Sequence, residues 1–238
     1  GDGAGVLTQI PYKIFRKEVE KLGHKLLKDS DLGIGFVFFP RASYEASAAR
    51  RIVDDVLRRR GIFLFGWRAV PIDANVLGDK ASSTLPGIEQ VLMGRDARWS
   101  DDEYERKLFL ARKEIERLIA EAGIQDFYIP SFSHRQIVHK GLLNSPQLDL
   151  FYKDLRNPQF ETTLCVYHQR YSTNTFPTWP LAHPFRMLGH NGEINTIAGN
   201  RLWMKARTSD FQSELFGKDV EWLDPVIQPG GSDSASID

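Results

Sequence analysis

The chain has 238 residues, of which 42% are hydrophobic, and its 31 Lys and Arg residues balance 31 Asp and Glu residues. This length and composition allow one large core, so we expect residues 1–238 to form a single domain. The balanced charge gives no reason to expect nucleic acid or an anionic membrane as a partner, and no apolar run approaches the roughly 20 residues of a membrane span. Cys165 is the one cysteine, which excludes an internal disulfide framework and is typical of a reducing compartment, so we expect a cytoplasmic protein.

The first half of the chain alternates predicted helices and strands. Helical spacing of apolar residues predicts helices over Tyr12 to about Lys28 and over Tyr44–Arg60. The apolar runs Leu32–Pro40 and Ile62–Pro71 predict buried strands. The polar stretch from Asp73 to about Gly87 predicts a loop.

The second half has the same mixed character. Ser100 and Glu103 form a capping box that predicts a helix over Asp101–Ala122. The remaining predicted elements are two β segments within Asp126–Gly141, a short helical stretch over Gln147–Leu155, strands over Thr162–Gln169 and Phe185–Gly189, and a helix over Asn195–Arg207. This order shows no strict βαβ repeat, so it predicts layers of the α+β class.

The segment "LGHNGEINTIAGN" allows two interpretations. Asn191-Gly192 is a strong signal for a tight turn, because both residues tolerate positive φ. Such a turn also leaves backbone N–H groups pointing outward, as an oxyanion site requires. Taken alone, the tetrapeptide "HNGE" is more typical of a plain turn.

Polar residues that suit a binding pocket are concentrated in the last third. "HQRYSTNTFPTWP" places Arg170, Ser172 and Thr173 at the end of a predicted strand, where an Arg fork can hold a carboxylate, although an exposed Arg is common there. In "PGGSDSASID", Asp233 can cap a helix or receive an ammonium group.

Other candidate sites are weaker. Cys165 lies in the middle of a predicted strand, where we expect it to be buried and unreactive. Ser232 and Ser234 lack the spacing of a nucleophile elbow. The His residues show no metal-ligand spacing, so we expect no metal site, and "GDGAG" lacks the residues of a phosphate loop and predicts a structural turn.

Several motifs in order resemble one family: "GDGAGVLTQIP", "FGWRAVP", "IVHKG", "HQRYSTNTFPTWPLAHPFRMLGHNGEINTIAGN" and "GGSDSASID". Together they resemble the glutaminase domain of the glutamate synthase large subunit and of ferredoxin-dependent glutamate synthases. The resemblance runs from Gly1 to Asp238 and implies a class II, N-terminal-nucleophile amidotransferase with a four-layer αββα sandwich.

The resemblance also implies roles for matching residues. Arg170 would bind the α-carboxylate of L-glutamine, Thr173 would line the same pocket, and Asp233 would receive the α-ammonium. The side-chain amide of Asn191 and the backbone N–H of Gly192 would form the oxyanion hole.

One feature departs from the family pattern. The family nucleophile is an N-terminal Cys activated by its own amino group, and the opening "GDGAG" resembles a stretch that follows this Cys. We therefore expect an incomplete domain that is inactive alone. Within the whole enzyme, the resemblance implies downstream synthase domains with FMN and an iron–sulfur cluster, and a small electron-donating subunit or ferredoxin as partner. A plastid location would follow for a plant or algal source, while this stretch itself is expected to hold no cofactor.

Two alternatives remain open at this stage. The chain could belong to another class II amidotransferase or amide hydrolase with the same fold. It could also be a degenerate domain that binds glutamine, or only a partner protein, without catalysis.

Overall fold

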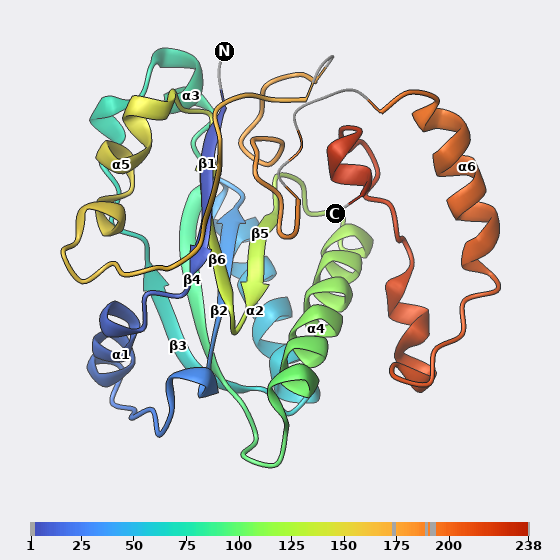
Figure 1. Ribbon diagram of the computed structural model, residues 1–238, viewed down its shortest axis with the longest axis horizontal. Coiled ribbons are helices and arrows are strands. Elements are labelled where there is room, and N and C mark those ends of the chain that lie inside the picture. Colours follow the sequence, from blue (N-terminus) through green and yellow to red (C-terminus); the bar gives the residue numbers. More distant parts are fainter. Residues whose placement is uncertain (1–2, 173–174, 189, 191–193, 238) are drawn as a thin grey trace.

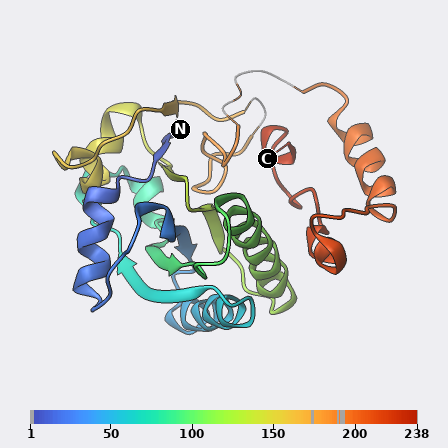
Figure 2. The ribbon, with the colours of Figure 1, turned by 60° about the horizontal axis from the view of Figure 1, so that its bottom comes forward.

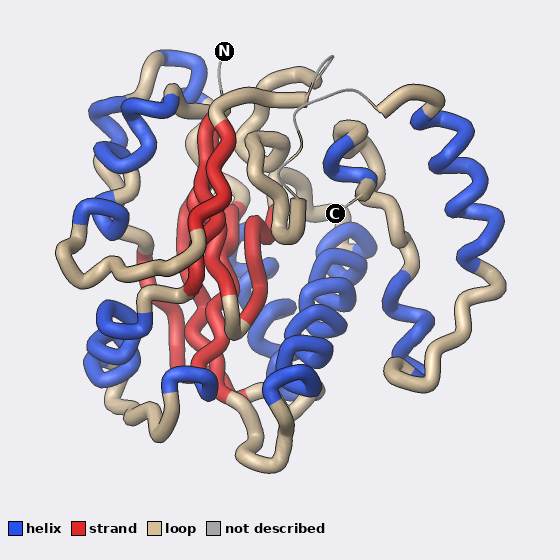
Figure 3. Tube along the Cα trace, viewed as in Figure 1, coloured by secondary structure: helices blue, strands red, loops and turns tan. Residues whose placement is uncertain are grey.

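Two antiparallel sheets form the centre of the molecule, and the helices surround them (Figures 1 and 3). The computed structural model describes residues 3–172, 175–188, 190 and 194–237. The strands are β1 (Ala4–Gln9), β2 (Leu32–Phe39), β3 (Phe63–Ala69), β4 (Gly87–Gly94), β5 (Tyr128–Ser133), β6 (Gln136–Gly141) and β7 (Cys165–His168). The helices are α1 (Tyr12–Lys21), α2 (Ser43–Arg59), α3 (Asp79–Ser83), α4 (Asp101–Glu121), α5 (Leu148–Phe151) and α6 (Ile197–Thr208).

The four-stranded sheet has the order β3-β4-β2-β5 and is buried on both faces at its centre. In β2, Phe36 and Phe38 belong to the core that also contains Ile137 of the other sheet, while Val37 and Phe39 belong to the core shared with α2 and α4. Because successive side chains of a strand point to opposite faces, burial on both sides explains the continuous apolar run of this strand.

Helices α2 and α4 lie side by side on the outer face of this sheet (Figure 2). Each has an apolar stripe toward the sheet, with Val53 and Leu57 from α2 and Leu108 and Ile115 from α4 fully buried. The Ser100 hydroxyl accepts the backbone N–H of Glu103 at 3.2 Å, so the predicted cap of α4 is present.

The three-stranded sheet has the order β6-β1-β7 and leads to the region of the site. Its register pairs Gly5 of β1 with His168 of β7. Only a glycine fits at position 5, since a Cβ there would lie 2.4 Å from the backbone oxygen of His183. The chain around His183 therefore packs directly against the central strand of this sheet.

The last part of the chain is attached more loosely, and α6 lies at the edge of the molecule (Figures 1 and 2). None of the described residues of α6 is buried, and Leu202 and Trp203 are 68% and 73% exposed. The Arg201 guanidinium donates to the carbonyls of Gly231 and Ser232 at 2.8 and 3.0 Å. One side chain of α6 thus holds the turn that carries Asp233.

The expected α+β sandwich is confirmed, with two facing sheets and helices on the outer face of the larger one. The predicted strands over 32–40 and 62–71, the helices over 44–60 and 101–122, and the two β segments within 126–141 agree with the structure to within a few residues. The strand over 162–169 and the helix over 195–207 are also present, with shorter or shifted bounds.

Other expectations were wrong. The first helix ends at Lys21 rather than near Lys28, because Gly23 adopts a φ of 83° that ends the helix. Part of "GDGAG" lies in β1 rather than in a turn, and β4 and α3 occupy stretches for which no strand or helix was predicted. Residues 185–188 form a turn closed by the Phe185 N–H and the Leu188 carbonyl at 2.9 Å, not a strand.

Candidate functional site

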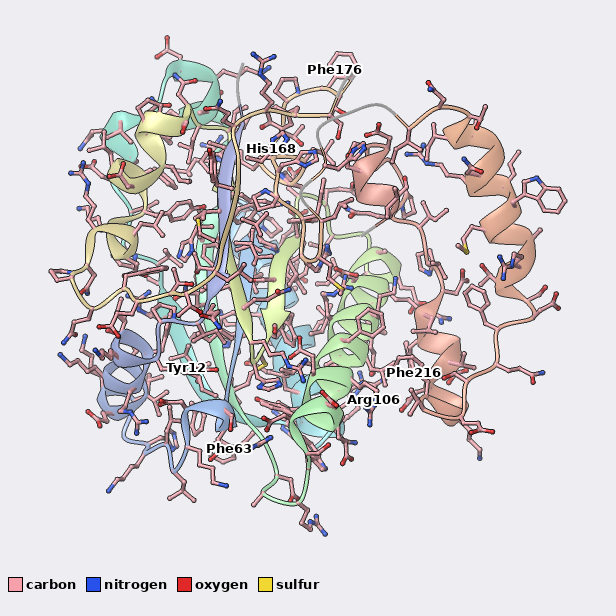
Figure 4. The ribbon with its side chains drawn as sticks, in the orientation of Figure 1. Tyr12, Phe63, Arg106, His168, Phe176 and Phe216 are labelled. Atoms are coloured by element: carbon pink, nitrogen blue, oxygen red, sulfur yellow. The ribbon has the colours of Figure 1, made fainter. Side chains whose placement is uncertain are left out.

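The first part of the candidate site is the end of β7. The His168 ring stacks on the ring of His183 with centroids 4.5 Å apart, and Figure 4 shows His168 close to the upper end of β1. The backbone N–H of Arg170 donates to His168 Nδ1 at 3.1 Å, so the backbone of Arg170 is held at the strand end. Its side chain is exposed and forms no ion pair within the described part of the chain. A guanidinium in this position is available to an anionic ligand.

The second part is the turn over Ser234–Ser236, which lies against the first part. The Ser172 hydroxyl donates to the Ser234 hydroxyl at 2.8 Å across 62 residues of sequence, and both side chains are buried. This hydrogen bond brings the segment of Arg170 next to the segment of Asp233. The two residues predicted to bind the two charged groups of an amino acid therefore lie on joined segments.

The Asp233 carboxylate accepts hydrogen bonds from two directions. Its Oδ1 accepts the backbone N–H of Ser234 at 2.6 Å and the Ser234 hydroxyl at 3.3 Å, and its Oδ2 accepts the backbone N–H of Ile194 at 3.1 Å. Partial burial acts to raise the pKa of Asp233. The backbone N–H groups of Ile194 and Ser234, followed by the hydroxyls of Ser172 and Ser234, outweigh it, and the pKa lies below its ordinary value of 3.8. Asp233 is therefore a carboxylate at neutral pH and can receive a cation.

Two histidines border the joined segments. His183 is fully buried, and its Nε2 lies 2.9 Å from the Ser172 hydroxyl oxygen. Desolvation, followed by the nearby His168 and Lys140, lowers the pKa of His183 to about 4, so the imidazole is neutral at physiological pH. His190 Nδ1 lies 3.1 Å from the Ser234 hydroxyl.

The structure brings two of the five predicted site residues, Arg170 and Asp233, onto neighbouring segments. Thr173, Asn191 and Gly192 lie outside the described residues. Their neighbours Ser172, His190 and Ile194 are each hydrogen-bonded to Ser234 or Asp233.

Sequence reasoning missed His183 and Ser234 as members of the site. From the sequence pattern, Ser234 is considered only as a nucleophile and the His residues together only as metal ligands. The sequence does contain a signal for them. In "AHPF" and "GGSDSAS", polar side chains stand beside small or apolar residues that are often buried, and a buried polar side chain needs a hydrogen-bond partner.

The expectation that Cys165 is buried was wrong. Cys165 begins β7 and is exposed, because β7 is an edge strand that pairs on one side with β1. It lies three residues from His168 along the strand, which corresponds to roughly 10 Å. Its thiol is therefore distant from the end of β7 that carries the site.

Within the described ranges, no group of three or more His, Cys, Asp or Glu side chains could hold a metal ion. Among the same residues, no helix is both long and apolar enough to cross a bilayer.

Comparison with known proteins agrees with this fold and with the polar groups of the candidate site. The family model of the class-II glutamine amidotransferases matches residues 1–238, and the chain belongs to this family. Over its whole length the chain is 47% identical to the glutamate synthase (NADPH) large chain of Azospirillum brasilense. It is 42% identical to the ferredoxin-dependent glutamate synthase 2 of Synechocystis sp. and 41% identical to the glutamate synthase (NADPH) large chain of Bacillus subtilis. The chain spans 16%, 15% and 16% of the length of these three relatives, respectively.

Proposed function

We propose that this chain forms the glutamine-binding part of a glutaminase site, which releases ammonia from L-glutamine. The observation that carries the proposal is the 2.8 Å hydrogen bond between Ser172 and Ser234. It joins the segment of an available guanidinium, Arg170, to the segment of an ionised carboxylate, Asp233. These two groups have the charges that bind the α-carboxylate and the α-ammonium of a free amino acid.

The remaining roles follow from family membership. We propose that Thr173 lines the glutamine pocket, and that the Asn191 amide and the Gly192 N–H stabilise the oxyanion formed during attack on the side-chain amide. In this reaction a thiolate adds to the amide carbon, the C–N bond breaks with proton transfer to the leaving nitrogen, and water then hydrolyses the thioester to glutamate. Removal of one oxyanion donor typically costs about 2.7–4 kcal/mol of transition-state stabilisation.

Cys165 is not assigned the nucleophilic role. It is exposed at the end of β7 opposite to His168, and it is the one cysteine of the 238 residues. We therefore expect these 238 residues by themselves to bind glutamine without hydrolysing it.

For the intact protein we propose that the ammonia aminates 2-oxoglutarate to give L-glutamate, since the relatives named above are glutamate synthases. An iron–sulfur cluster takes several cysteine thiolates, and this chain has one cysteine, so we place the cluster on downstream synthase domains. We place the FMN there as well, as the family resemblance implies. The electron donor would be a small NADPH-linked subunit or ferredoxin. The location would be the cytoplasm, or a plastid as in the relatives described as chloroplastic.

The test measures ammonia release and glutamine binding by the intact protein. The substitutions Arg170→Ala and Asp233→Asn each remove one charged contact with glutamine, so KM and Kd should rise roughly 10-fold to 100-fold. Arg98→Ala is the control, because Arg98 is 87% exposed in its side chain and pairs only with Asp96 among the described residues. Binding without hydrolysis by the intact protein would instead identify a non-catalytic glutamine-binding domain. Absence of binding would overturn the proposal.

A further inference from the structure

The site contains a chain of hydroxyl groups that links a buried imidazole to the Asp233 carboxylate. A serine hydroxyl has one proton to donate and can accept two hydrogen bonds. The Ser172 and Ser234 hydroxyl oxygens lie 2.8 Å apart, and the Ser234 hydroxyl oxygen lies 3.3 Å from Asp233 Oδ1. Protons that run from Ser172 to Ser234 and on to the carboxylate satisfy both contacts.

With the protons in this order, both neighbouring imidazoles act as donors. His183 Nε2, 2.9 Å from the Ser172 hydroxyl oxygen, donates to Ser172. His190 Nδ1, 3.1 Å from the Ser234 hydroxyl oxygen, donates to Ser234. The Nδ1 atom of buried His183 has no hydrogen-bond partner among the described residues. A buried N–H or a buried charge without a partner is costly, so a neutral ring with its proton on Nε2 fits this position better than a charged ring.

The chain ends on one oxygen of Asp233 and spares the other. Each carboxylate oxygen offers about two lone pairs. Oδ1 accepts from the N–H and the hydroxyl of Ser234, while Oδ2 accepts only from the Ile194 N–H within the described structure. Among the described residues, Oδ2 therefore has the greater acceptor capacity left.

We propose that His183, Ser172 and Ser234 are positioning residues that hold Asp233 with Oδ2 directed to the α-ammonium of the substrate. Their protons run from His183 Nε2 through both hydroxyls to Asp233 Oδ1, so the carboxylate cannot rotate without breaking this chain. The inference rests on the proposed function, because it assumes that the cation is the ammonium of glutamine. The three residues act through Asp233 and need no contact with the substrate.

A test of the role in binding compares two substrates of the intact protein. Glutaramate is glutamine without its α-amino group and makes no use of Asp233. Ser172→Ala should raise KM for glutamine roughly threefold to tenfold, the loss of one hydrogen bond, and leave KM for glutaramate and kcat for both substrates within twofold. Ser172→Thr should restore the glutamine value, because it keeps the hydroxyl. In an Asp233→Asn background, Ser172→Ala should have little further effect.

Ser209→Ala is the control, from the end of α6 rather than from the turn of Asp233. The Ser209 hydroxyl is exposed and donates to the Ala206 carbonyl at 3.2 Å within the same helix. This variant should leave KM for both substrates unchanged. Equal increases for glutamine and glutaramate in Ser172→Ala would overturn the positioning role and indicate a general structural effect.

A second measurement examines the chain without any substrate. Two-bond ¹H–¹⁵N spectra of histidine-labelled protein at neutral pH should show His183 protonated on Nε2 and His190 protonated on Nδ1. A His183 ring protonated on Nδ1 would overturn the inference even if glutamine is the substrate. The protein could instead show both expected tautomers but neither bind nor hydrolyse glutamine. That result would overturn the proposed function, and with it the role of Asp233 toward the substrate ammonium.

Discussion

Arg68 shows how single residues decide the stability of this fold. Its guanidinium forms two hydrogen bonds with the Asp154 carboxylate, at 2.7 and 2.9 Å, and its Nε lies 3.2 Å from Glu18. The side chains of Arg68 and Asp154 are only 11% and 6% exposed. Burial acts to lower the pKa of Arg68, but the two carboxylates outweigh it and raise the pKa, so the pair stays ionised.

Removal of this guanidinium should be costly. Arg68→Met leaves the Asp154 charge buried without its bidentate partner, and we expect the free energy of unfolding to fall by about 3–5 kcal/mol. Denaturant titration measures the loss. Arg68→Met combined with Asp154→Leu should recover much of it, since the buried Asp154 charge is then also removed and Glu18 keeps its ion pair with Lys21.

The matched control is Arg98→Met. Arg98 and Asp96 also form a close ion pair, at 2.6 Å, but the Arg98 side chain is 87% exposed. Its loss should leave the denaturation midpoint unchanged. Equal losses of unfolding free energy for Arg68→Met and Arg98→Met would contradict the conclusion that burial makes the ion pair of Arg68 important for stability.

At the scale of elements, β1 connects the core to the site. It is the central strand of its sheet and passes directly under the backbone of His183 at Gly5. A methyl group at this position would lie 2.4 Å from the His183 oxygen and 2.5 Å from the Cβ of Lys140. Neither neighbour is the free end of a flexible side chain, so the strand or the loop must shift.

Gly5→Ala should therefore destabilise the protein by about 1–3 kcal/mol, the usual cost of overpacking a core. Thermal unfolding monitored by circular dichroism measures this loss. Gly199→Ala is the control, because an added Cβ in α6 meets no atom within 4 Å outside the local helix backbone. It should leave the melting temperature unchanged or raise it, since Ala favours a helix by about 1 kcal/mol over Gly. An unchanged melting temperature for Gly5→Ala would show that the loop around His183 can shift at little energetic cost.

The elements also show what sequence can reveal. α4 was predictable because its apolar period, its Ser100 cap and its following Gly123 all agree. β4 was missed because "GIEQVLMG" mixes buried polar and apolar residues, with Gln90 buried at the centre of the sheet. Residues 185–188 looked like a strand because of their apolar character, yet they form a turn in which Phe185 is buried and Met187 is exposed.

The site was predictable only in part. The roles of Arg170 and Asp233 stay predictions from motifs whose residue types match the charges of an amino acid, and the structure places the two residues on joined segments. The hydrogen bond between Ser172 and Ser234 was not predictable, because no local pattern encodes a contact across 62 residues. The tertiary fold alone creates it.

At the scale of the whole molecule, stability should depend on buried neutral histidines. His139 is fully buried among the rings of Phe36, Tyr152 and Phe160. Desolvation lowers its pKa to about 4, as it does for His183. In the unfolded chain both rings take up protons near their ordinary pKa of 6.5. The unfolded state therefore binds more protons between these two values.

We expect the free energy of unfolding to change little just above about pH 7 and to fall as the pH drops from 6.5 to about 4. Glu116 and Asp233 have a lowered pKa in the folded protein. Their protonation therefore reduces the free energy of unfolding only below their ordinary pKa values of 4.5 and 3.8. Urea titrations at several pH values measure the slope. His139→Phe should reduce the slope between pH 6.5 and 4, and an unchanged slope in this variant would show that His139 is protonated in the folded state.

The hydrogen bond between Ser172 and Ser234 also bears on chirality. It fixes the turn of Asp233 against the strand end of Arg170, so an α-ammonium and an α-carboxylate bound there each have a set direction. The side-chain amide must also reach the reacting group. The ammonium, the carboxylate and the side chain on Cα then each have a fixed position, and the mirror-image amino acid can place only two of these three groups correctly. D-glutamine should therefore be excluded by geometry rather than by charge, and enantiomer selectivity should weaken when the bond between the two serines is removed.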